Sequence, residues 1–265
     1  LFRGVSRDIG TQRVFGGQIL AQSLLAACAT VEGRLPHSLH GYFLRAGDHE
    51  APVVYQVDRT RDGRSFSSRR VQAIQHGRPI FTFAASFQVQ EEGLEHQFTA
   101  PDVPPPEEAT PIEQLQCEDI EKLSVNLQRW LDRFGPFEFR AVRGGDPNDR
   151  VPRPPFKDLW FRLHGDYRDD PVMNRALLAY VSDFYLVGTA TLPHGISWLR
   201  DRLMVASLDH AMWFHRPHKL DDWFLYTQDS PNTSGARGFT RGAIYARDGT
   251  LVASVALPVG DPAAD

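Results

Sequence analysis

The chain has 265 residues, of which 42% are hydrophobic and 23% are charged, and its formal net charge is −4 at pH 7. This length allows one large domain or two domains of ordinary size, with apolar residues to spare for a core. The small negative charge argues against a nucleic-acid binder, which would present a basic face, and no apolar run reaches the roughly 18 residues of a membrane span.

The first predicted element is a buried helix over residues 15–29, which are rich in Ala and Leu. It begins with the pair Gly16 and Gly17, but neither Gly-x-Gly-x-x-Gly nor a following Lys-Ser/Thr is present, so the pair is not a phosphate-binding loop. Two interpretations of the glycines remain open. They allow a ligand to approach the backbone N–H groups of the helix, or they allow the helix start to pack tightly against a neighbour.

Antiparallel strands are predicted to follow this helix. Apolar and polar residues alternate, or β-branched and aromatic residues cluster, over 37–45, 52–58, 65–74 and 79–87. His76 and Gly77 form the turn of a hairpin between the last two of these strands. The first 88 residues are therefore predicted to contain one buried helix and several long strands.

The composition changes after residue 90. Residues 91–111 are acidic and rich in proline, which is typical of a connector. An amphipathic helix is predicted over 112–134, and strands are predicted over 136–142 and 159–163. We accordingly divide the chain into an N-terminal domain (1–90), a connector with its helix (91–134) and a C-terminal domain (135–265).

Residues 174–188 form a second predicted buried helix, because nearly every position from 176 to 187 is apolar. Asp183 lies in the middle of this stretch. A buried carboxylate costs several kcal/mol when nothing compensates its charge. Either a local donor or a neighbouring strand satisfies Asp183, or the protein needs an acid at this place.

The strand pattern then repeats over 203–217, 223–228, 235–245 and 251–257. Phe214, Tyr226 and Gly249 follow Phe43, Tyr55 and Gly77 at an offset of about 172 residues, which indicates an internal duplication. A helix followed by a strongly curved antiparallel sheet, twice over, predicts an α+β fold in which each sheet wraps its buried helix. The lack of alternating βαβ units argues against a dinucleotide-binding fold.

The spacing of cysteine and histidine indicates neither a disulfide framework nor a metal site. The two cysteines, Cys28 and Cys117, lie far apart in the sequence, which is typical of a reducing compartment. The ten histidines show no spacing such as His-Glu-x-x-His. We therefore expect a cytoplasmic protein with no metal and no other cofactor.

Several blocks of sequence, in order, resemble one family, the type II acyl-CoA thioesterases (TesB-like), and the resemblance covers nearly the whole chain. The blocks are residues 13–18 (RVFGGQ), 37–45 (HSLHGYFLR), 61–71 (RDGRSFSSRRV), 180–183 (YVSD), 208–217 (LDHAMWFHRP) and 234–242 (SGARGFTRG). The resemblance implies a double hotdog fold, an acyl-CoA substrate hydrolysed to fatty acid and CoA, and assembly into homodimers or homotetramers.

The resemblance also implies a water-activating site in the second hotdog, made of an Asp on the central helix, a Thr or Ser on the first long strand, and a Gln on the last strand. Asp183 and Ser207 match the first two positions, but Leu257 occupies the position of the Gln. Thioester hydrolysis needs an acceptor for the proton of a water and groups that orient this water, and Leu257 offers no hydrogen bond. The alternative is an acyl-CoA-binding double hotdog with weak or no hydrolytic activity.

Two other kinds of site are disfavoured by the sequence. Ser207 and His210 are three residues apart on a predicted strand, so we expect their side chains to face opposite sides and not to form a Ser-His-Asp triad. There is also no Gly-x-Ser-x-Gly elbow. A hotdog dehydratase or hydratase would need a His-based acid–base site, and neither central helix carries a His.

Overall fold

The computed structural model describes residues 1–6, 13–112, 114, 136–143, 151–165, 170–196 and 205–260. The helix predicted over 112–134 lies outside these residues, apart from positions 112 and 114. The helix predicted over 15–29 is confirmed as α1 (Gly16–Cys28). The other helical segments are α4 (Pro171–Val181), α5 (Leu186–Thr191) and the 3-10 turn η2 (Leu192–His194). No helix in the described part is long and apolar enough to cross a lipid bilayer.

The predicted strands are confirmed with ends moved by a few residues, except that the strand predicted over 203–217 is broken into two pieces. The strands are β1 (Phe2–Gly4), β2 (Leu35–Phe43), β3 (Val53–Asp62), β4 (Phe66–Gln75), β5 (Arg78–Gln88), β6 (Thr110–Pro111), β7 (Phe137–Arg143), β8 (Phe156–Leu163), β9 (Ala206–Ser207), β10 (Asp209–Phe214), β11 (Phe224–Ser234), β12 (Arg237–Ala246) and β13 (Leu251–Gly260).

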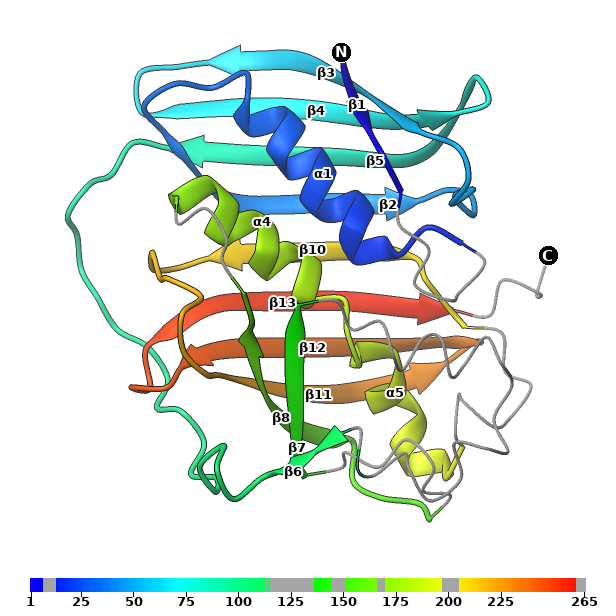
Figure 1. The fold of residues 1–265 in the computed structure, drawn as a ribbon, viewed down its shortest axis with the longest axis vertical. Helices are drawn as coiled ribbons and strands as arrows, with labels where there is room; N and C mark the ends of the chain where they lie inside the picture. Colours follow the sequence, from blue (N-terminus) through cyan, green and yellow to red (C-terminus); the bar gives the residue numbers. More distant parts are fainter. Residues whose placement is uncertain are drawn as a thin grey trace.

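One antiparallel sheet joins these strands in the order β1-β3-β4-β5-β2-β10-β13-β12-β11-β8-β7-β6, with β9 paired to β13 (Figure 1). The order β3-β4-β5-β2 of the first copy returns in reverse as β10-β13-β12-β11. The two copies meet where β2 pairs with β10, with Leu39 opposite Met212. The sheet therefore shows the predicted duplication and the α+β double hotdog. The domain boundaries at residues 90 and 134 stay predictions.

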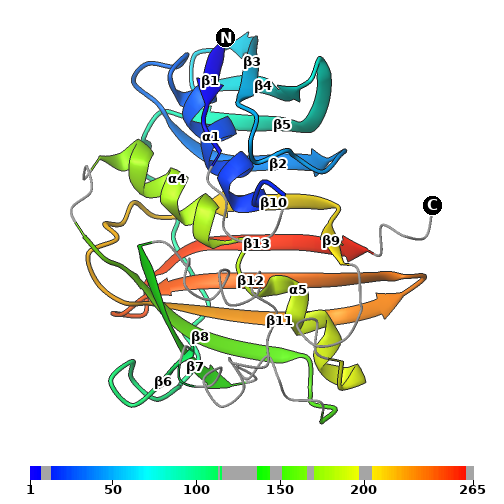
Figure 2. The same cartoon turned by 45° about the vertical axis from the view of Figure 1, so that its right-hand side comes forward.

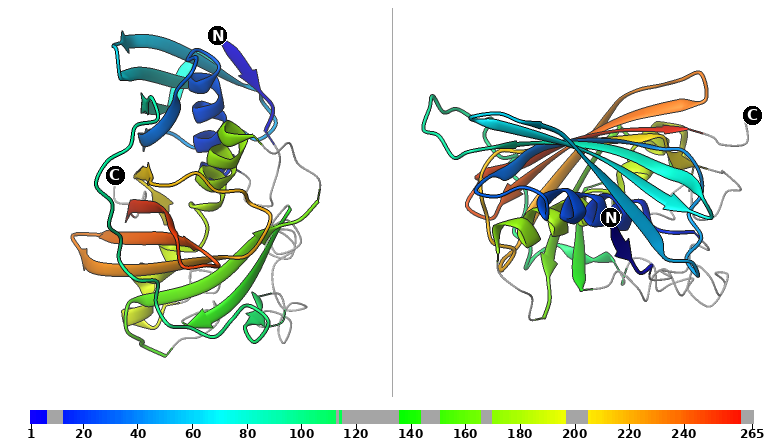
Figure 3. Two further views of the ribbon diagram at one scale, coloured as in Figure 1. Left: turned by 90° about the vertical axis from the view of Figure 1, so that its left-hand side faces the viewer. Right: turned by 90° about the horizontal axis from the view of Figure 1, so that it is seen from above.

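Helices α1 and α4 lie side by side against the same face of the sheet (Figures 1 and 2). The sheet curves around them, as the view from above shows (Figure 3). Their close approach depends on Gly17, because a Cβ there would collide with the carbonyl oxygen of Tyr180 on α4. The Phe15 ring also packs against Tyr180, with ring centroids 5.2 Å apart. Tight packing of the helix start, one of the two interpretations of the glycine pair, is thus confirmed at Gly17.

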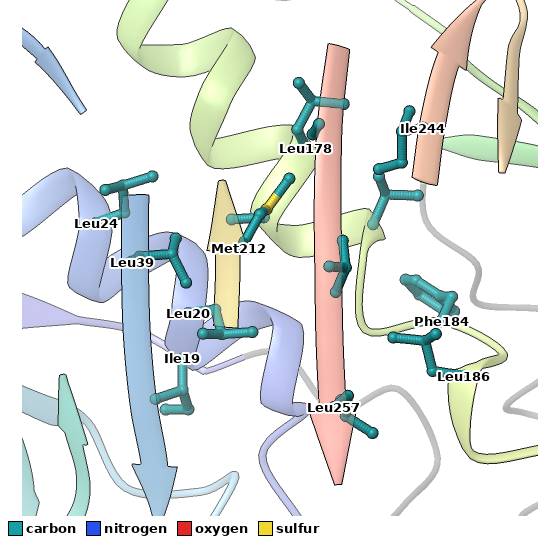
Figure 4. Close-up of a cluster of buried hydrophobic side chains, with 14 of the residues drawn as sticks. Ile19, Leu20, Leu24, Leu39, Leu178, Phe184, Leu186, Met212, Ile244 and Leu257 are labelled. Carbon is teal, nitrogen blue, oxygen red and sulfur yellow. The ribbon is translucent and has the colours of Figure 1, made fainter. Parts of the chain in front are cut away.

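The larger of the two hydrophobic clusters in the described residues extends through both copies of the fold. Its members come from both central helices and from the inner faces of the strands, and Figure 4 shows part of it around β2, β10 and β13. No residue of α1 is exposed, as expected for a helix that is apolar on all sides. The labelled core residues in Figure 4 include Leu20, Leu24, Leu39, Leu178, Met212, Ile244 and Leu257.

The helix predicted over 174–188 is wrong in its extent. Helix α4 starts earlier, at Pro171, where Asp170 caps it by accepting hydrogen bonds from the N–H groups of Val172 and Met173. It ends at Val181, and Tyr185 adopts a left-handed conformation with φ 67° before α5 begins. A left-handed residue cannot continue an α-helix, since it reverses the sense of the backbone. Asp183 therefore lies in the turn between two helices and not inside one.

Candidate active site

The turn between α4 and α5 places Asp183 beside the broken strand β9–β10. Its side chain is only 6% exposed. The hydroxyl of Ser207 donates a long hydrogen bond of 3.4 Å to Asp183 Oδ1. The same oxygen lies 3.6 Å from Nδ1 of His210, whose side chain is fully buried. The structure thus brings Asp183 and Ser207 together, as predicted, and adds His210.

The prediction that Ser207 and His210 face opposite sides is wrong, and a β-bulge is the reason. Ser207 pairs with Val259, and Ala211 pairs with Ala256. Three residues therefore lie between these two paired positions on the β9–β10 side, and two lie between them on β13. Side chains normally alternate between the two faces of the sheet, and the additional residue on the β9–β10 side interrupts this alternation once. Both Ser207 and His210 consequently face inward.

These residues do not form a Ser-His-Asp triad. Ser207 bonds to Asp183 directly, while Nε2 of His210 lies 3.0 Å from the hydroxyl oxygen of Ser182. The Ser182 hydroxyl in turn donates to the carbonyl oxygen of Ala179 at 2.9 Å. The contacts run from Ser207 to Asp183, and from Asp183 through His210 to Ser182. A triad needs the His between the nucleophilic Ser and the Asp, so Ser207 is not placed as an activated nucleophile. Ser182 does lie on the far side of His210 from Asp183, but it is completely buried and its hydroxyl donates to the carbonyl oxygen of Ala179.

Two buried side chains of β11 hold the backbone on either side of Asp183. The Tyr226 hydroxyl donates to the carbonyl oxygen of Ser182 at 2.7 Å, and Nε2 of Gln228 donates to the carbonyl oxygen of Phe184 at 3.2 Å. Residues two apart on a strand share a face, which explains how both reach one turn. Burial, and next the negative charge of Asp183, raise the pKa of Tyr226 well above its usual value. The phenol therefore stays neutral and keeps donating.

The N-terminus of α1 closes the site from the first copy of the fold. A Cβ added to Gly16 would lie 2.5 Å from Asp183 Oδ2 and 3.1 Å from the ring of Phe43, so the carboxylate lies directly against the helix start. No side chain caps α1. The positive end of the helix dipole favours a negative charge at this place. The candidate site therefore uses residues of both copies, and the glycine pair is part of it.

We expect Gly16→Ala to lower kcat for the hydrolysis that the family resemblance implies by about a hundredfold, because the new methyl group pushes the Asp183 carboxylate away from its position and displacements of about 1 Å can cost that much. Steady-state kinetics, with thermal unfolding as a check on the fold, measure the effect. Gly93→Ala is the matched control, since a Cβ there would meet no atom within 4 Å. Full activity of Gly16→Ala would show that Asp183 does not need this position.

Leu257 occupies the remaining predicted position on β13 and is completely buried. It belongs to the same apolar cluster as Phe184 and Leu186 (Figure 4), and it lies two residues before Val259, the strand partner of Ser207. Gln228 brings an amide to the turn, but its Nε2 is bonded to Phe184 and its Oε1 accepts from Thr189 at 2.9 Å. Both the nitrogen and the oxygen of the Gln228 amide are therefore already hydrogen-bonded to other residues of the protein.

Sequence reasoning missed four parts of the site: the inward orientation of His210, the Ser182 hydroxyl, and the side chains of Tyr226 and Gln228. One signal was available for the last two. Tyr226 and Gln228 are two residues apart on the strand predicted over 223–228, and residues at this spacing share a face. Nothing in the local sequence indicates which turn they would contact.

Comparisons with known proteins agree with this architecture. A family model described as the acyl-CoA thioesterase N-terminal domain matches residues 5–88, and a model described as acyl-CoA thioesterase matches residues 153–259. The chain is 40% identical to acyl-CoA thioesterase 2 of Haemophilus influenzae, over 96% of this chain and 89% of that protein. It is 41% identical to human acyl-coenzyme A thioesterase 8, over 97% of this chain and 82% of that protein.

A solved structure shows the same fold over almost the full length. The acyl-CoA thioesterase II TesB2 from Mycobacterium marinum superposes with a TM-score of 0.80 at 39% sequence identity, covering 97% of this chain and 91% of that one. The tesB protein of Mycobacterium avium subspecies paratuberculosis superposes with a TM-score of 0.81 at 32% identity. Both comparisons extend across the two copies and the seam between them.

Proposed function

Because the chain belongs to the acyl-CoA thioesterase family, and is thus a thioester hydrolase, we propose that it hydrolyses fatty acyl-CoA through a water activated by Asp183. The observation that carries this proposal is the position of Asp183, which is nearly buried yet bonded by Ser207 and flanked by the start of α1. A carboxylate within hydrogen-bond reach of a bound water can accept its proton as the water attacks.

In the proposed reaction, the water lies between Asp183 and Ser207 and attacks the carbonyl carbon of the thioester. Asp183 takes one proton of the water as the C–O bond forms. The Ser207 oxygen accepts a hydrogen bond from the second proton while its own proton points to Asp183. The tetrahedral intermediate then collapses, the C–S bond breaks, and the proton held by Asp183 goes to the CoA sulfur. The products are a free fatty acid and CoA.

The developing oxyanion needs hydrogen-bond donors in place before the reaction. We assign this role to the backbone N–H groups of Gly16 and Gly17. Within the described part of the chain these two groups form no hydrogen bond, whereas the N–H groups of Gln18 and Ile19 bond to the Phe15 carbonyl. Unpaired N–H groups at a helix start are typical binding partners of a negatively charged oxygen.

Leu257 supports a second candidate, an acyl-CoA-binding protein with weak or no hydrolysis. A Gln at this position would orient the water, and removal of one positioned hydrogen-bond partner costs on the order of a hundredfold or more in rate. Ser207 and Asp183 remain, so we favour hydrolysis at a reduced rate. The assembly into homodimers or homotetramers and the cytoplasmic location stay predictions.

A panel of acyl-CoA esters of increasing chain length tests the proposal. We expect release of free thiol under multiple-turnover conditions, together with saturable acyl-CoA binding. Stoichiometric binding without thiol release across the panel would establish the binding protein instead. The absence of both binding and release, with the fold intact by thermal unfolding, would contradict both candidates.

A further inference from the structure

An open pocket of about 410 Å³ lies where β2 ends and the hairpin between β4 and β5 turns. Arg45 lines this pocket from the segment after β2, and His76 and Arg78 line it from the hairpin. In Figure 1 the start of α1, the end of β2 and the hairpin all lie on the right-hand side of the first copy. The pocket is therefore at the same end of the sheet as the start of α1, which contacts Asp183.

Short connections join the pocket to the candidate active site. Phe43, whose ring lies beside Gly16, is the last residue of β2 and precedes Arg45 by two positions. Two residues span at most about 7 Å, so the backbone of Arg45 is close to the site. The backbone N–H of Val14, which lies two residues before α1, donates to the carbonyl oxygen of Gly47 at 2.9 Å. The segment after β2 is thus fixed against the start of α1.

The two arginines of the pocket keep hydrogen-bond donors for a ligand. One nitrogen of the Arg45 guanidinium, Nη1, donates to the carbonyl oxygen of Pro79 at 2.7 Å, which holds the group in place and leaves its other N–H groups unused. Within the described part of the chain, the Arg78 side chain forms no hydrogen bond, and neither arginine forms an ion pair. Both guanidinium groups therefore carry a charge that no carboxylate neutralises directly.

Asp48 is the acidic residue in the lining of the pocket, and its carboxylate is bonded elsewhere. One oxygen accepts from the backbone N–H of Glu50 at 2.9 Å, and the other lies 3.0 Å from Nε2 of His76. These two contacts, that of Glu50 first, hold the pKa of the Asp48 carboxyl below its usual value. The positive charges of the pocket outnumber this negative charge even when His76 is neutral, so the pocket favours an anion.

The second copy of the fold has the equivalent arginine in a different setting. The backbone N–H of Arg45 donates to the carbonyl oxygen of Ile80, and that of Arg216 donates to Val252 in the same way. The Arg216 side chain, however, lies 3.6 Å from the carboxylate of Glu95. Since β10 runs antiparallel to β2, Arg216 also lies at the opposite end of these strands from the start of α1. Of the two arginines, Arg45 alone combines an unneutralised charge with a position near the site.

We propose that Arg45 and Arg78 bind a phosphate group of CoA and form the subsite for the nucleotide end of the substrate. This inference rests on the proposed function, which places the thioester beside Asp183. The pantetheine arm separates the thioester of acyl-CoA from its phosphates, so the phosphates must bind at the outer rim of the site. A guanidinium matches phosphate in charge and in geometry, because its N–H groups form pairs of parallel hydrogen bonds with the phosphate oxygens.

Arg78→Gln should raise KM for acyl-CoA by about tenfold, since a hydrogen bond to a charged group contributes enough for a change of this order. We expect kcat to stay at the wild-type level, because a contact with a distant phosphate is the same in the ground state and in the transition state. Arg45→Gln should act in the same direction. Arg216→Gln is the matched control and should leave KM unchanged. Thermal unfolding checks the fold, and the Arg78 side chain has no hydrogen bond to lose.

Substrates without phosphates distinguish this subsite from a change in the shape of the site. Acyl-pantetheine has the same thioester and the same arm but no phosphate, so its kcat/KM should be equal in the wild type and in both variants. The subsite is contradicted by a KM that rises equally for acyl-CoA and acyl-pantetheine, or that rises for neither. Acyl-dephospho-CoA lacks the 3′-phosphate alone. An effect that persists with this substrate assigns the arginines to the diphosphate, and an effect that disappears assigns them to the 3′-phosphate.

Binding of CoA itself separates this inference from the proposed function. Isothermal titration calorimetry with CoA should give a dissociation constant about tenfold larger in Arg45→Gln and in Arg78→Gln, and an unchanged one in Arg216→Gln. Weaker CoA binding by these two variants of a protein that does not hydrolyse acyl-CoA would support the subsite and overturn the proposed hydrolysis. Hydrolysis by the wild type, with CoA binding and KM unchanged in both variants, would overturn the subsite and leave the proposed hydrolysis in place.

Discussion

Asp183→Asn should lower kcat for acyl-CoA hydrolysis by about a thousandfold while KM changes little. The amide has nearly the shape of the carboxylate and can still accept the hydrogen bond from Ser207, so substrate binding should persist. It cannot take a proton from water, and loss of a positioned general base costs on the order of 10²–10⁴ in rate. Steady-state kinetics with a saturated and an unsaturated acyl chain, both at neutral pH, measure the change.

Asp229→Asn provides the matched control for this experiment. Asp229 is an aspartate on β11 that forms an ion pair with Arg241 at the surface, 2.8 Å apart. An exposed pair of this kind contributes little to stability, so kcat should remain within about twofold of the wild type. A drop in kcat of less than tenfold in Asp183→Asn would mean that another group accepts the water proton.

Leu257→Gln should raise kcat by about a hundredfold. The new amide would come from β13, from a position near the strand partner of Ser207, and would provide the water with an additional orienting hydrogen bond of the kind whose removal costs about that factor. The substitution also introduces a polar group into a completely buried position. An incompletely bonded amide costs about 1–3 kcal/mol, so a lower temperature of unfolding should accompany the faster reaction.

Leu257→Met distinguishes hydrogen bonding from a change of shape. Met has a similar volume and offers no comparable hydrogen bond, so it should leave kcat at the wild-type level. A gain in both variants would indicate that Leu257 limits the rate by packing. No gain in Leu257→Gln, with the fold intact, would show that the Ser207 and Asp183 contacts already orient the water fully.

The sequence by itself determined the two copies of helix and strands, because side-chain periodicity and turn residues are local signals. It also determined that Asp183 is buried and, through family resemblance, that Ser207 belongs beside it. The same comparison identified Leu257 as a departure from the family pattern.

Only the tertiary structure decided the details of the site. The bulge that turns Ser207 and His210 to the same side depends on one strand having an additional residue opposite β13, and the sequence of a strand does not reveal the register of its partner. The end of α4 before Asp183 likewise has no sequence signal such as Gly or Pro. Tyr226 and Gln228 hold this turn from a strand more than 40 residues away, and such long-range contacts exist only once the sheet has closed around the helices.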